Sequence, residues 1–427
     1  MNSILALGIF LVAYFFIATE KINRIAVVVA GAGLMLALKL TDAEHAFFSH
    51  ATGIDWNVIF LLLGMMIIVS VVHKTGFFEF VAMHLVRLAK GRPVYIMVSL
   101  SIFIAVASAI LDNVTTIMLA VPMIIIVAKK LNISPTPLLL SGIFSSNIGG
   151  AATLIGDPPN IIIASKADLS FNDFLVHMAP MVVVVLIVII PMMIFMFRKQ
   201  LVNSPADREA LADINPRDFL KDIPLLKKSG LVLTATIIAF ITHSITHLEP
   251  SVIALIAAGV LVAITRLKPR DYALDVEWGT LLFFAGLFIM VGTLVKVGVL
   301  AEFANFLAEQ FAGRPEFATY SLLALSAVLS GIVDNIPYVA AMSPVVADLS
   351  TTLVAAGDKT LWWALAFGAD FGGNATIVGA SANVVAIGLA SAAGIKISFW
   401  TFAKYGIPVT IVSTAMVAPY LGFFYLS

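Results

Sequence analysis

Cysteine is absent from this sequence, and charge is scarce. The 427 residues contain no cysteine, which excludes disulfides, thiolate metal sites and thiol chemistry. Charged residues make up only 12% of the chain, whereas about 25% is usual in a soluble domain. The 25 basic and 25 acidic residues cancel, so no net charge favours a nucleic acid. A soluble enzyme, a disordered chain and a nucleic-acid-binding protein are therefore excluded.

The sequence also lacks the motifs of an enzyme. It contains no phosphate-binding P-loop. It also shows no nucleophile paired with a base and no metal-ligand spacing. We therefore expect a protein that is not an enzyme and that holds neither a cofactor nor a metal ion.

Apolar runs are what the sequence has in abundance. Hydrophobic residues make up 61% of the chain, and its mean hydropathy is +1.05. A membrane-spanning helix needs about 17–25 apolar residues, and runs of about that length or longer recur throughout. They cover residues 3–19, 24–41, 56–73, 93–128, 135–165, 176–197, 230–246, 251–265, 278–295, 316–347, 361–391 and 405–426. The sequence therefore predicts an all-α polytopic membrane protein.

The two halves of the chain repeat one another at a shift of 222 or 223 residues. The matching pairs include Trp56 and Trp278, Gly64 and Gly286, Lys74 and Lys296, Asp112-Asn113 and Asp334-Asn335, and Gly149-Gly150 and Gly372-Gly373. A polar stretch rich in Lys, Arg, Asp and Pro separates the halves. We predict a first inverted repeat at 1–198, a cytoplasmic linker at 199–229 and a second inverted repeat at 230–427. Paired repeats with interrupted spans are typical of secondary transporters.

Two runs, 93–128 and 316–347, are too long for one helix, and an Asp-Asn pair interrupts each of them. We interpret both as re-entrant hairpins that enter and leave the membrane on one side. Each repeat then has about five transmembrane helices, one of them broken, plus one hairpin. The odd number of crossings inverts the second repeat. With both termini on the outer side of the plasma (inner) membrane, 20 Lys and Arg residues lie inside and 5 outside, in agreement with the positive-inside rule.

Four aspartates, Asp112, Asp157, Asp334 and Asp370, lie within long apolar stretches. A carboxylate at the bilayer centre costs about 2.5–3.5 kcal/mol, so each must be paired, protonated or bound to a solute or ion. The alternative is that they cap broken half-helices, for which Asp is well suited. Asp370 suits this alternative least, because its repeat partner is the neutral Asn147. Asp112, Asp334 and Asp370 are the candidates for carrying coupling protons.

Glycine pairs and neutral polar residues surround these aspartates. The glycines are predicted to let the chain leave the helix without a Cβ penalty, the alternative being close helix packing. The amides and hydroxyls are predicted to line a cavity, although each alone could join two membrane helices. The predicted substrate- or ion-binding residues are Asp112, Asn113, Thr115, Thr116, Asn147, Gly149, Gly150, Thr153, Asp157 and Asn160 in the first repeat, and Asp334, Asn335, Asp370, Gly372, Gly373, Asn374, Thr376, Ser381 and Asn383 in the second.

The segments at 111–116 and 147–160 resemble motifs of the ArsB/NhaD group of the ion transporter superfamily, and 333–337 and 372–376 resemble their second-repeat counterparts. That group holds arsenite permeases, sodium/proton antiporters and the melanosomal P protein. The resemblance covers nearly the whole chain. It implies two inverted repeats, two hairpins, two broken helices and elevator-like alternating access, with the substrate held at the hairpin tips and helix breaks.

Two functions fit these features. The first is proton-coupled efflux of arsenite or antimonite, because a neutral trihydroxide suits Asn, Thr and carboxylate groups. The second is sodium/proton antiport, in which carboxylates and free carbonyls bind a hard cation. An anion channel or an organic-anion carrier is less favoured, since the aspartates repel carboxylates. The expected partners are the inorganic solute with protons, or sodium, and the lipid bilayer. The sequence leaves open a homodimer and a soluble ATPase subunit docked on the 198–229 loop.

Overall fold

The computed structural model describes residues 2–19, 21–202, 215–355 and 357–426, and every regular element in those ranges is a helix. The first part of the chain forms α1 (Asn2–Thr19), α2 (Arg24–Ala37), α3 (Ala43–Phe47), α4 (Trp56–Lys74), α5 (Phe77–Leu88), α6 (Pro93–Ile110), α7 (Asn113–Lys130), α8 (Thr136–Gly150), α9 (Pro158–Ala167), α10 (Phe171–His177) and α11 (Ala179–Phe197). The second part forms η1 (Pro216–Phe219), α13 (Ile223–Thr246), α14 (Pro250–Thr265), α15 (Pro269–Ala273), α16 (Trp278–Lys296), α17 (Val299–Phe311), α18 (Pro315–Ile332), α19 (Asn335–Leu353), α20 (Thr360–Gly372), η2 (Ile377–Gly379), α21 (Ser381–Ala392) and α22 (Phe399–Tyr425).

Nine of the described helices are long and apolar enough to cross a membrane. They are α1, α4, α6, α7, α11, α13, α16, α18 and α22. Their length of 18 residues or more suits the hydrocarbon core of a bilayer, which is about 30 Å thick. The prediction of an all-α polytopic membrane protein is confirmed.

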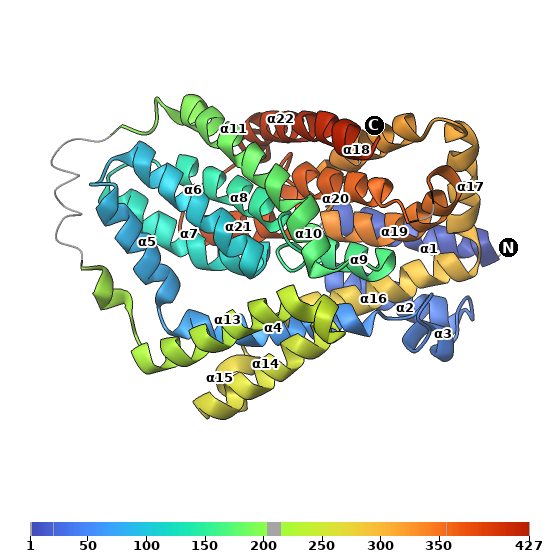
Figure 1. The fold of residues 1–427 in the computed structure, drawn as a ribbon, viewed down its shortest axis with the longest axis horizontal. Coiled ribbons are helices and arrows are strands. Elements are labelled where there is room, and N and C mark those ends of the chain that lie inside the picture. Colours follow the sequence, from blue (N-terminus) through green and yellow to red (C-terminus); the bar gives the residue numbers. More distant parts are fainter. Residues whose placement is uncertain (1, 20, 203–214, 356, 427) are drawn as a thin grey trace.

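The helices form two layers, and in Figure 1 α4, α13 and α14 of one layer lie below α6, α7 and α8 of the other. The support layer consists of α1, α2, α4, α13, α14 and α16, in which α4 packs on α14 and α2 packs on α16. The hairpin layer consists of α6 to α11 and α18 to α22, in which α6 packs on α8 and α18 packs on α20. The predicted binding residues all belong to the hairpin layer or to its connections.

Glycines let the support helices approach each other closely. A Cβ atom on Gly64 of α4 would lie 2.7 Å from the carbonyl carbon of Ala254 on α14. A Cβ atom on Gly286 of α16 would lie 3.0 Å from the side chain of Val28 on α2. Small residues at such crossings are typical of membrane helices. Because Gly64 and Gly286 are repeat partners, the two halves build the same type of contact twice.

Reciprocal ion pairs also join the two halves of the support layer. Lys74 at the end of α4 pairs with Asp275, at 2.8 Å between Nζ and Oδ2. Its repeat partner Lys296, at the end of α16, pairs with Asp42, at 2.5 Å. Each half therefore supplies one lysine to the other half.

The helix order α4 to α7 recurs as α16 to α19. The first residues of the corresponding helices, Trp56 and Trp278, Phe77 and Val299, Pro93 and Pro315, and Asn113 and Asn335, all differ by 222 positions. The short helices α5 and α17 were not predicted, because they are too short and too polar to register as spans. Each follows a glycine with positive φ, Gly76 (77°) or Gly298 (83°), where the left-handed backbone favours glycine.

Each Asp-Asn pair lies at the tip of a helical hairpin. Residues 111–112 join α6 to α7, and residues 333–334 join α18 to α19. In Figure 1 the first hairpin opens toward the α5 end of the molecule and the second toward the α17 end. The predicted interruptions are confirmed. The inversion of the second repeat with respect to a membrane stays a prediction.

The glycine pairs at the ends of α8 and α20 have a different role from the predicted one. None of these glycines has a positive φ, so the chain does not leave the helix through a left-handed turn. Instead, a Cβ on Gly149 would lie 2.2 Å from the carbonyl oxygen of Ala105, and a Cβ on Gly372 would lie 2.6 Å from that of Ala327. The predicted reason for these glycines, that they let the chain leave the helix, was therefore wrong. The glycines let a broken helix touch the backbone of a hairpin arm.

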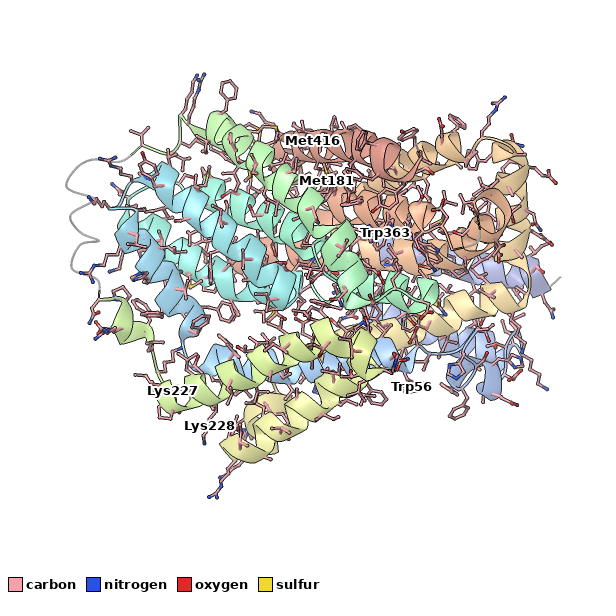
Figure 2. The ribbon with its side chains drawn as sticks, viewed as in Figure 1. Trp56, Met181, Lys227, Lys228, Trp363 and Met416 are labelled. Carbon is pink, nitrogen blue, oxygen red and sulfur yellow. The ribbon has the colours of Figure 1, made fainter. Side chains whose placement is uncertain are left out.

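The polar stretch between the repeats is only partly described, since residues 203–214 of the predicted linker lie outside the described residues. After them, η1 packs against α5, and α13 begins at Ile223, before the predicted linker end at 229. Figure 2 shows Lys227 and Lys228 near the outer end of α13, and Trp363 inside the hairpin layer. The N-terminus lies toward the opposite end of the molecule (Figure 1).

Candidate functional site

The hairpin tips place Asp112 and Asp334 at the N-termini of α7 and α19. Oδ1 of Asp112 accepts a hydrogen bond from the backbone N–H of Thr115 (2.7 Å), and Oδ1 of Asp334 accepts one from Ile336 (3.0 Å). A helix start leaves such N–H groups free, and an aspartate there satisfies one of them. Capping therefore explains part of the role of these two aspartates.

Capping does not explain the other two aspartates. Asp157 directly precedes α9 but makes no side-chain cap hydrogen bond. Asp370 lies within the last turn of α20 and not at a helix start. Their exposed fractions are only 1% and 0%. A buried carboxylate in such a place needs another partner.

The two broken helices are α8 with α9 in the first repeat and α20 with α21 in the second. The second half of each one packs against the other repeat. α9 of the first repeat packs on α19 and α20, and α21 of the second packs on α7 and α8. This exchange gathers distant residues into one buried group, which we call the central cluster. It consists of Asn113, Asn147, Asp157, Asn160, Asn335, Asp370, Asn374 and Asn383, none of which is more than 2% exposed.

Asp157 receives hydrogen bonds from both hairpin tips. Nδ2 of Asn113, from the first hairpin, donates to Oδ2 of Asp157 at 2.7 Å. Nδ2 of its repeat partner Asn335, from the second hairpin, donates to both carboxyl oxygens at 3.3 Å. The carboxylate therefore joins two asparagines that occupy equivalent positions in the two repeats.

Asn147 connects the two broken helices. Its Nδ2 donates to Oδ1 of Asn374 at 3.1 Å and to Oδ1 of Asn383 at 2.9 Å. Its Oδ1 faces Nδ2 of Asn113 at 3.4 Å. The side chain thus links residues from both hairpin-layer halves without any charge.

Asn160 and Asn383 hold the helix breaks together. Each is near the start of the second half of a broken helix, and each donates from Nδ2 to two backbone carbonyls of the break. These carbonyls belong to Gly150 (3.5 Å) and Thr153 (3.1 Å) for Asn160, and to Gly373 (2.7 Å) and Thr376 (2.9 Å) for Asn383. A break in a membrane helix leaves such carbonyls without partners, so these amides replace the missing helical hydrogen bonds.

Thr153 and Thr376 tie the breaks to the hairpins. The hydroxyl of Thr153 donates to the carbonyl of Ala109 on α6 (2.5 Å), and that of Thr376 donates to the carbonyl of Gly331 on α18 (2.7 Å). Both threonines were predicted as binding residues. The structure uses their hydroxyl protons for backbone support.

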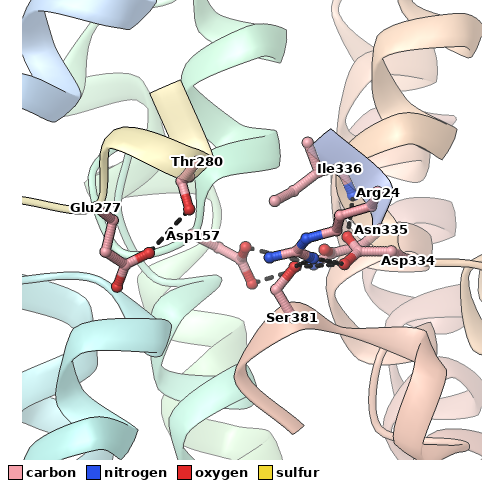
Figure 3. Close-up of polar contacts among 8 residues, drawn as sticks. All are labelled: Arg24, Asp157, Glu277, Thr280, Asp334, Asn335, Ile336 and Ser381. Carbon is pink, nitrogen blue, oxygen red and sulfur yellow. Dashed lines mark hydrogen bonds and ion pairs between the residues drawn. The ribbon is translucent and has the colours of Figure 1, made fainter. Parts of the chain in front are cut away.

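Arg24 at the start of α2 reaches from the support layer to the second hairpin (Figure 3). Its guanidinium donates to Oδ2 of Asp334 at 3.2 Å and to Oγ of Ser381 at 2.6 Å. Ser381 in turn donates to Oδ2 of Asp334. Sequence reasoning counted Arg24 only as a basic loop residue. Its position at the first turn of an apolar run was the available signal.

Glu277 is a second residue that sequence reasoning missed. It directly precedes α16, and its Oε2 accepts a hydrogen bond from the hydroxyl of Thr280 at 2.9 Å. Its other oxygen is buried without a partner among the described residues. Asp112 and Arg24 are close enough to act on its charge. The support layer therefore presents one cation and one carboxyl group to the hairpin tips.

Several buried polar atoms of this region lack hydrogen-bond partners within the described part of the chain. They are Oδ1 of Asn113, Oγ1 of Thr116, Oδ1 of Asn160, both carboxyl oxygens of Asp370 and Nδ2 of Asn374. Native proteins satisfy nearly all buried polar groups with protein or ordered water, so such a concentration marks a polar place that water, a solute, an ion or a proton completes. No three His, Asp or Glu side chains in the described ranges are grouped so as to hold a metal ion.

The structure brings most of the predicted residues together. Asp112, Asp334 and Asp370 all act on the charge of Asp157, so the four aspartates lie in one region of the hairpin layer. Thr115 and Thr116 lie at the first tip, and Ser381 lies at the second. The glycines and the two break threonines form the frame of the site.

Two cavities border α9 outside the central cluster. One of about 440 Å³ is bordered by Asn57, Asp173 and His243. Another of about 570 Å³ is bordered by Trp56 and Lys166. Asn57 and Ser165 border both cavities, which therefore adjoin along α9. The central cluster is closed in this conformation.

Comparisons with known proteins agree on a transporter. A family model described as CitMHS, citrate transporter, matches residues 14–368. An uncharacterized transporter of Mycobacterium tuberculosis is 47% identical over 420 residues, which cover 98% of each chain. The human P protein is 32% identical over 487 residues, covering 96% of this chain and 58% of the P protein. The YdaH transporter of Alcanivorax borkumensis, described as having an unusual topology, is similar in fold, with a TM-score of 0.54 and 14% identity over 85% of this chain and 84% of that one.

Proposed function

The protein is a membrane transporter of the CitMHS citrate transporter family, within the ion transporter superfamily, and from this premise we propose that it is a proton-coupled secondary transporter of a small inorganic solute. Within the superfamily we assign it to the ArsB/NhaD group, on the motifs at the hairpin tips and breaks. The observation that carries the proposal is Asp157, a buried carboxylate held by equivalent asparagines of both repeats.

The balance of charge in the site disfavours a free organic anion as the solute. Four aspartates act on one another's charge in this region, while the cation that reaches it, Arg24, is already paired with Asp334. A citrate ion would bring further carboxylates into this acidic and poorly hydrated region, where like charges repel strongly. A neutral or cationic solute meets no such barrier.

The unpartnered atoms favour a neutral polyhydroxy solute. Oδ1 of Asn113 can only accept hydrogen bonds, and the same is true of the oxygens of Asp370 when its carboxyl group is ionised. Nδ2 of Asn374, by contrast, can only donate. Arsenite and antimonite trihydroxides both donate and accept, so they can satisfy both kinds of group. We therefore propose arsenite or antimonite efflux as the first candidate function.

Sodium/proton antiport is the second candidate. Oδ1 of Asn113, Oγ1 of Thr116 and the carboxylate of Asp157 are oxygen ligands of the kind that a hard cation prefers. The N–H group of Asn374 would have to turn away from a bound cation. Because of this requirement, sodium/proton antiport is a less favoured function than arsenite or antimonite efflux.

The proposed movement is an elevator-like shift of the hairpin layer against the support layer. Arg24 belongs to the support layer, and its partners Asp334 and Ser381 belong to the hairpin layer. A relative movement of the layers must break these contacts. We place the protein in the plasma (inner) membrane with both termini outside, as the distribution of Lys and Arg indicates. A homodimer and an ATPase subunit on the 198–229 loop stay predictions.

The test uses purified protein in liposomes that contain a pH-sensitive dye. Arsenite, antimonite, sodium, lithium and citrate are added in turn under an imposed pH gradient. We expect arsenite and antimonite to move protons and Asp157→Asn to abolish the movement. Asp348→Asn is the matched control, because Asp348 is exposed on α19, and it should behave like the wild type.

The other outcomes are equally informative. Proton movement driven by sodium or lithium alone would replace the first candidate by the second. Proton movement driven by citrate alone would overturn the charge argument. A solute flux without any proton movement would overturn proton coupling.

A further inference from the structure

Four buried asparagines of the central cluster form a chain of hydrogen bonds whose direction is fixed. The chain begins at Asn383, whose Nδ2 donates to the backbone carbonyls of Gly373 and Thr376 at 2.7 and 2.9 Å. A carbonyl oxygen only accepts hydrogen bonds, so the amide nitrogen of Asn383 must face these two groups. Its oxygen is therefore the atom that meets the next side chain, Asn147.

Asn147 fixes the orientation of the asparagine that follows. Because Oδ1 of Asn383 only accepts, Asn147 must turn its Nδ2 toward that oxygen, at 2.9 Å. The second N–H of the same nitrogen donates to Oδ1 of Asn374 at 3.1 Å. Oδ1 of Asn147 is left to accept from Nδ2 of Asn113 at 3.4 Å. These orientations start from backbone carbonyls, so they do not depend on the ionisation of any aspartate.

Two amide atoms stay without partners beside this chain. Asn374 uses its oxygen on Asn147, and its Nδ2 is buried with no partner among the described residues. Asn113 uses its nitrogen on Asn147 and on Asp157, and its Oδ1 is likewise buried with no partner in the described ranges. Asn374 and Asn113 are only 0% and 2% exposed. One free donor and one free acceptor therefore belong to two side chains that both contact Asn147.

The second repeat cannot build the same arrangement. At a shift of 223 residues, the partner of Asn147 is Asp370 and the partner of Asn374 is Ala151. An alanine side chain neither donates nor accepts a hydrogen bond, and an ionised aspartate has no N–H group. The free donor of Asn374 thus exists on one side only of the pseudo-symmetric centre.

A hydroxyl group matches both free atoms, because it donates its own hydrogen and also accepts one. A monatomic cation would contact Oδ1 of Asn113 but would face the N–H group of Asn374. We propose that Asn113 and Asn374 recognise a hydroxyl group of a neutral solute, and that Asn147 is the positioning residue that keeps the N–H group of Asn374 free. This inference rests on the proposed function and names the groups that recognise its solute.

The two amides also explain how such a site discriminates between solutes. Water donates and accepts in the same way, so a solute hydroxyl can replace water here without leaving either atom unpaired. A solute of similar shape without a hydroxyl group would leave a buried donor and a buried acceptor unpaired, which polar sites reject strongly. Recognition of the solute is therefore assigned to neutral amides and not to the aspartates.

The first experiment measures arsenite binding to the purified protein by calorimetry. Asn374→Ala removes the free donor and should lower the affinity about tenfold, the effect of one buried hydrogen bond. Asn147→Leu keeps a similar side-chain size but no longer orients Asn374, so it should lower the affinity by a similar factor. Ser343→Ala is the matched control, because Ser343 is equally buried in the hairpin layer but bonds only within its own helix. Its affinity should equal that of the wild type.

The double variant separates positioning from a general structural role. In Asn147→Leu, Asn113 keeps its hydrogen bond to Asp157, so the loss of affinity should act through Asn374. Asn147→Leu with Asn374→Ala should therefore bind arsenite about as weakly as either single variant. Independent losses would multiply to about a hundredfold, and that result would overturn the positioning role. Melting curves of the same samples identify any variant that is not folded.

A further measurement needs no variant. Anomalous diffraction from wild-type crystals soaked in antimonite locates antimony directly. We expect the peak beside Asn113 and Asn374. A bound antimony atom that contacts neither amide would overturn the proposal even if Asn147→Leu does not fold.

Boric acid and glycerol, two other neutral hydroxyl solutes, separate this inference from the proposed function. If arsenite moves with protons but Asn374→Ala and Asn147→Leu bind it like the wild type, the inference fails and the proposed function stands. If the wild type neither binds nor moves arsenite or antimonite but binds boric acid or glycerol, and both variants weaken that binding, the proposed function fails and the inference stands. If no neutral hydroxyl solute binds, both fail.

Discussion

The two hairpin tips share a capping aspartate but have opposite electrostatic surroundings. Asp112 and Asp334 both cap the second arm of a hairpin through a backbone N–H group. Asp334 is also paired with Arg24 at 3.2 Å. Asp112 has no cation within the described ion pairs and lies near another carboxyl group, that of Glu277. Duplication thus preserved the capping aspartate, while the neighbouring layer made the charges around the two tips different.

The difference arises because Arg24 has no repeat counterpart. A shift of 222 residues maps Arg24 onto Thr246, which lies at the end of α13. The second tip is therefore fastened to the support layer by an ion pair, and the first tip is not. A pseudo-symmetric carrier can in this way hold one hairpin while leaving the other free to respond to a solute. The following predictions test this asymmetry.

Removal of Arg24 should have the largest effect on stability. Arg24→Ala leaves the carboxylate of Asp334 buried without its cation, and breaking a buried ion pair costs about 3–5 kcal/mol. Because the Arg24 side chain is 29% exposed, we expect about 3 kcal/mol, the lower end of that range. Denaturant unfolding in detergent measures the loss. The double variant Arg24→Ala with Asp334→Asn should recover most of it, and no recovery would show that Arg24 stabilises the protein through other contacts.

Substitution of the glycines beside the two helix breaks should cause the next largest loss of stability. Gly149→Ala and Gly372→Ala each force a methyl group against a hairpin backbone, and overpacking typically costs about 1–3 kcal/mol. The loss should be greater at Gly149, where the approach is 2.2 Å, than at Gly372, where it is 2.6 Å. The melting temperature in detergent provides the comparison. Gly230→Ala is the control, since nothing lies within 4 Å of its added Cβ. Equal losses at all three positions would contradict the packing explanation.

Substitution of Asp112 should lower the free energy of unfolding less than substitution of Arg24 does. Asp112→Ala removes a helix cap, which is worth about 1 kcal/mol, while Asp112→Asn keeps a good capping residue and should be nearly neutral for stability. Asp334→Asn, by contrast, leaves Arg24 without its anion and should destabilise the protein clearly. Parallel unfolding curves of the two Asn variants test the asymmetry directly. Equal stability of these variants would mean that the ion pair contributes little.

Removal of the surface ion pairs of the support layer, Lys296 with Asp42 and Lys74 with Asp275, should change the stability least. The hydrogen bond from Lys296 is the main cause that lowers the pKa of Asp42 below its ordinary value of 3.8. Because the folded-state pKa is the lower one, this pair stabilises the protein above about pH 4 and the stabilisation is lost on further acidification. Lys296→Ala should therefore flatten the acid side of the stability profile. Lys74→Ala, which breaks the equivalent pair, should cost less than about 1 kcal/mol at neutral pH.

Much of this architecture could be predicted from single residues and their repetition. The Asp-Asn pairs at 112–113 and 334–335 marked both hairpin tips correctly, because a polar pair within an apolar run signals a break. The short helices α5 and α17 were missed, since a search for long apolar runs passes over them. The glycine pairs were found but explained wrongly. Their reason lies in Ala105 and Ala327 on another helix, which no local pattern indicates.

The sequence by itself determined the membrane location, the repetition and the positions of the breaks, because these follow from composition, spacing and local backbone chemistry. Only the tertiary structure decided which polar groups meet. The exchange of α9 and α21 between repeats places Asn335 on Asp157, and the packing of the two layers brings Arg24 to Asp334. Hydrogen bonds between residues more than 100 positions apart depend on how helices pack. That packing decides which aspartate receives asparagine donors and which is paired with a cation.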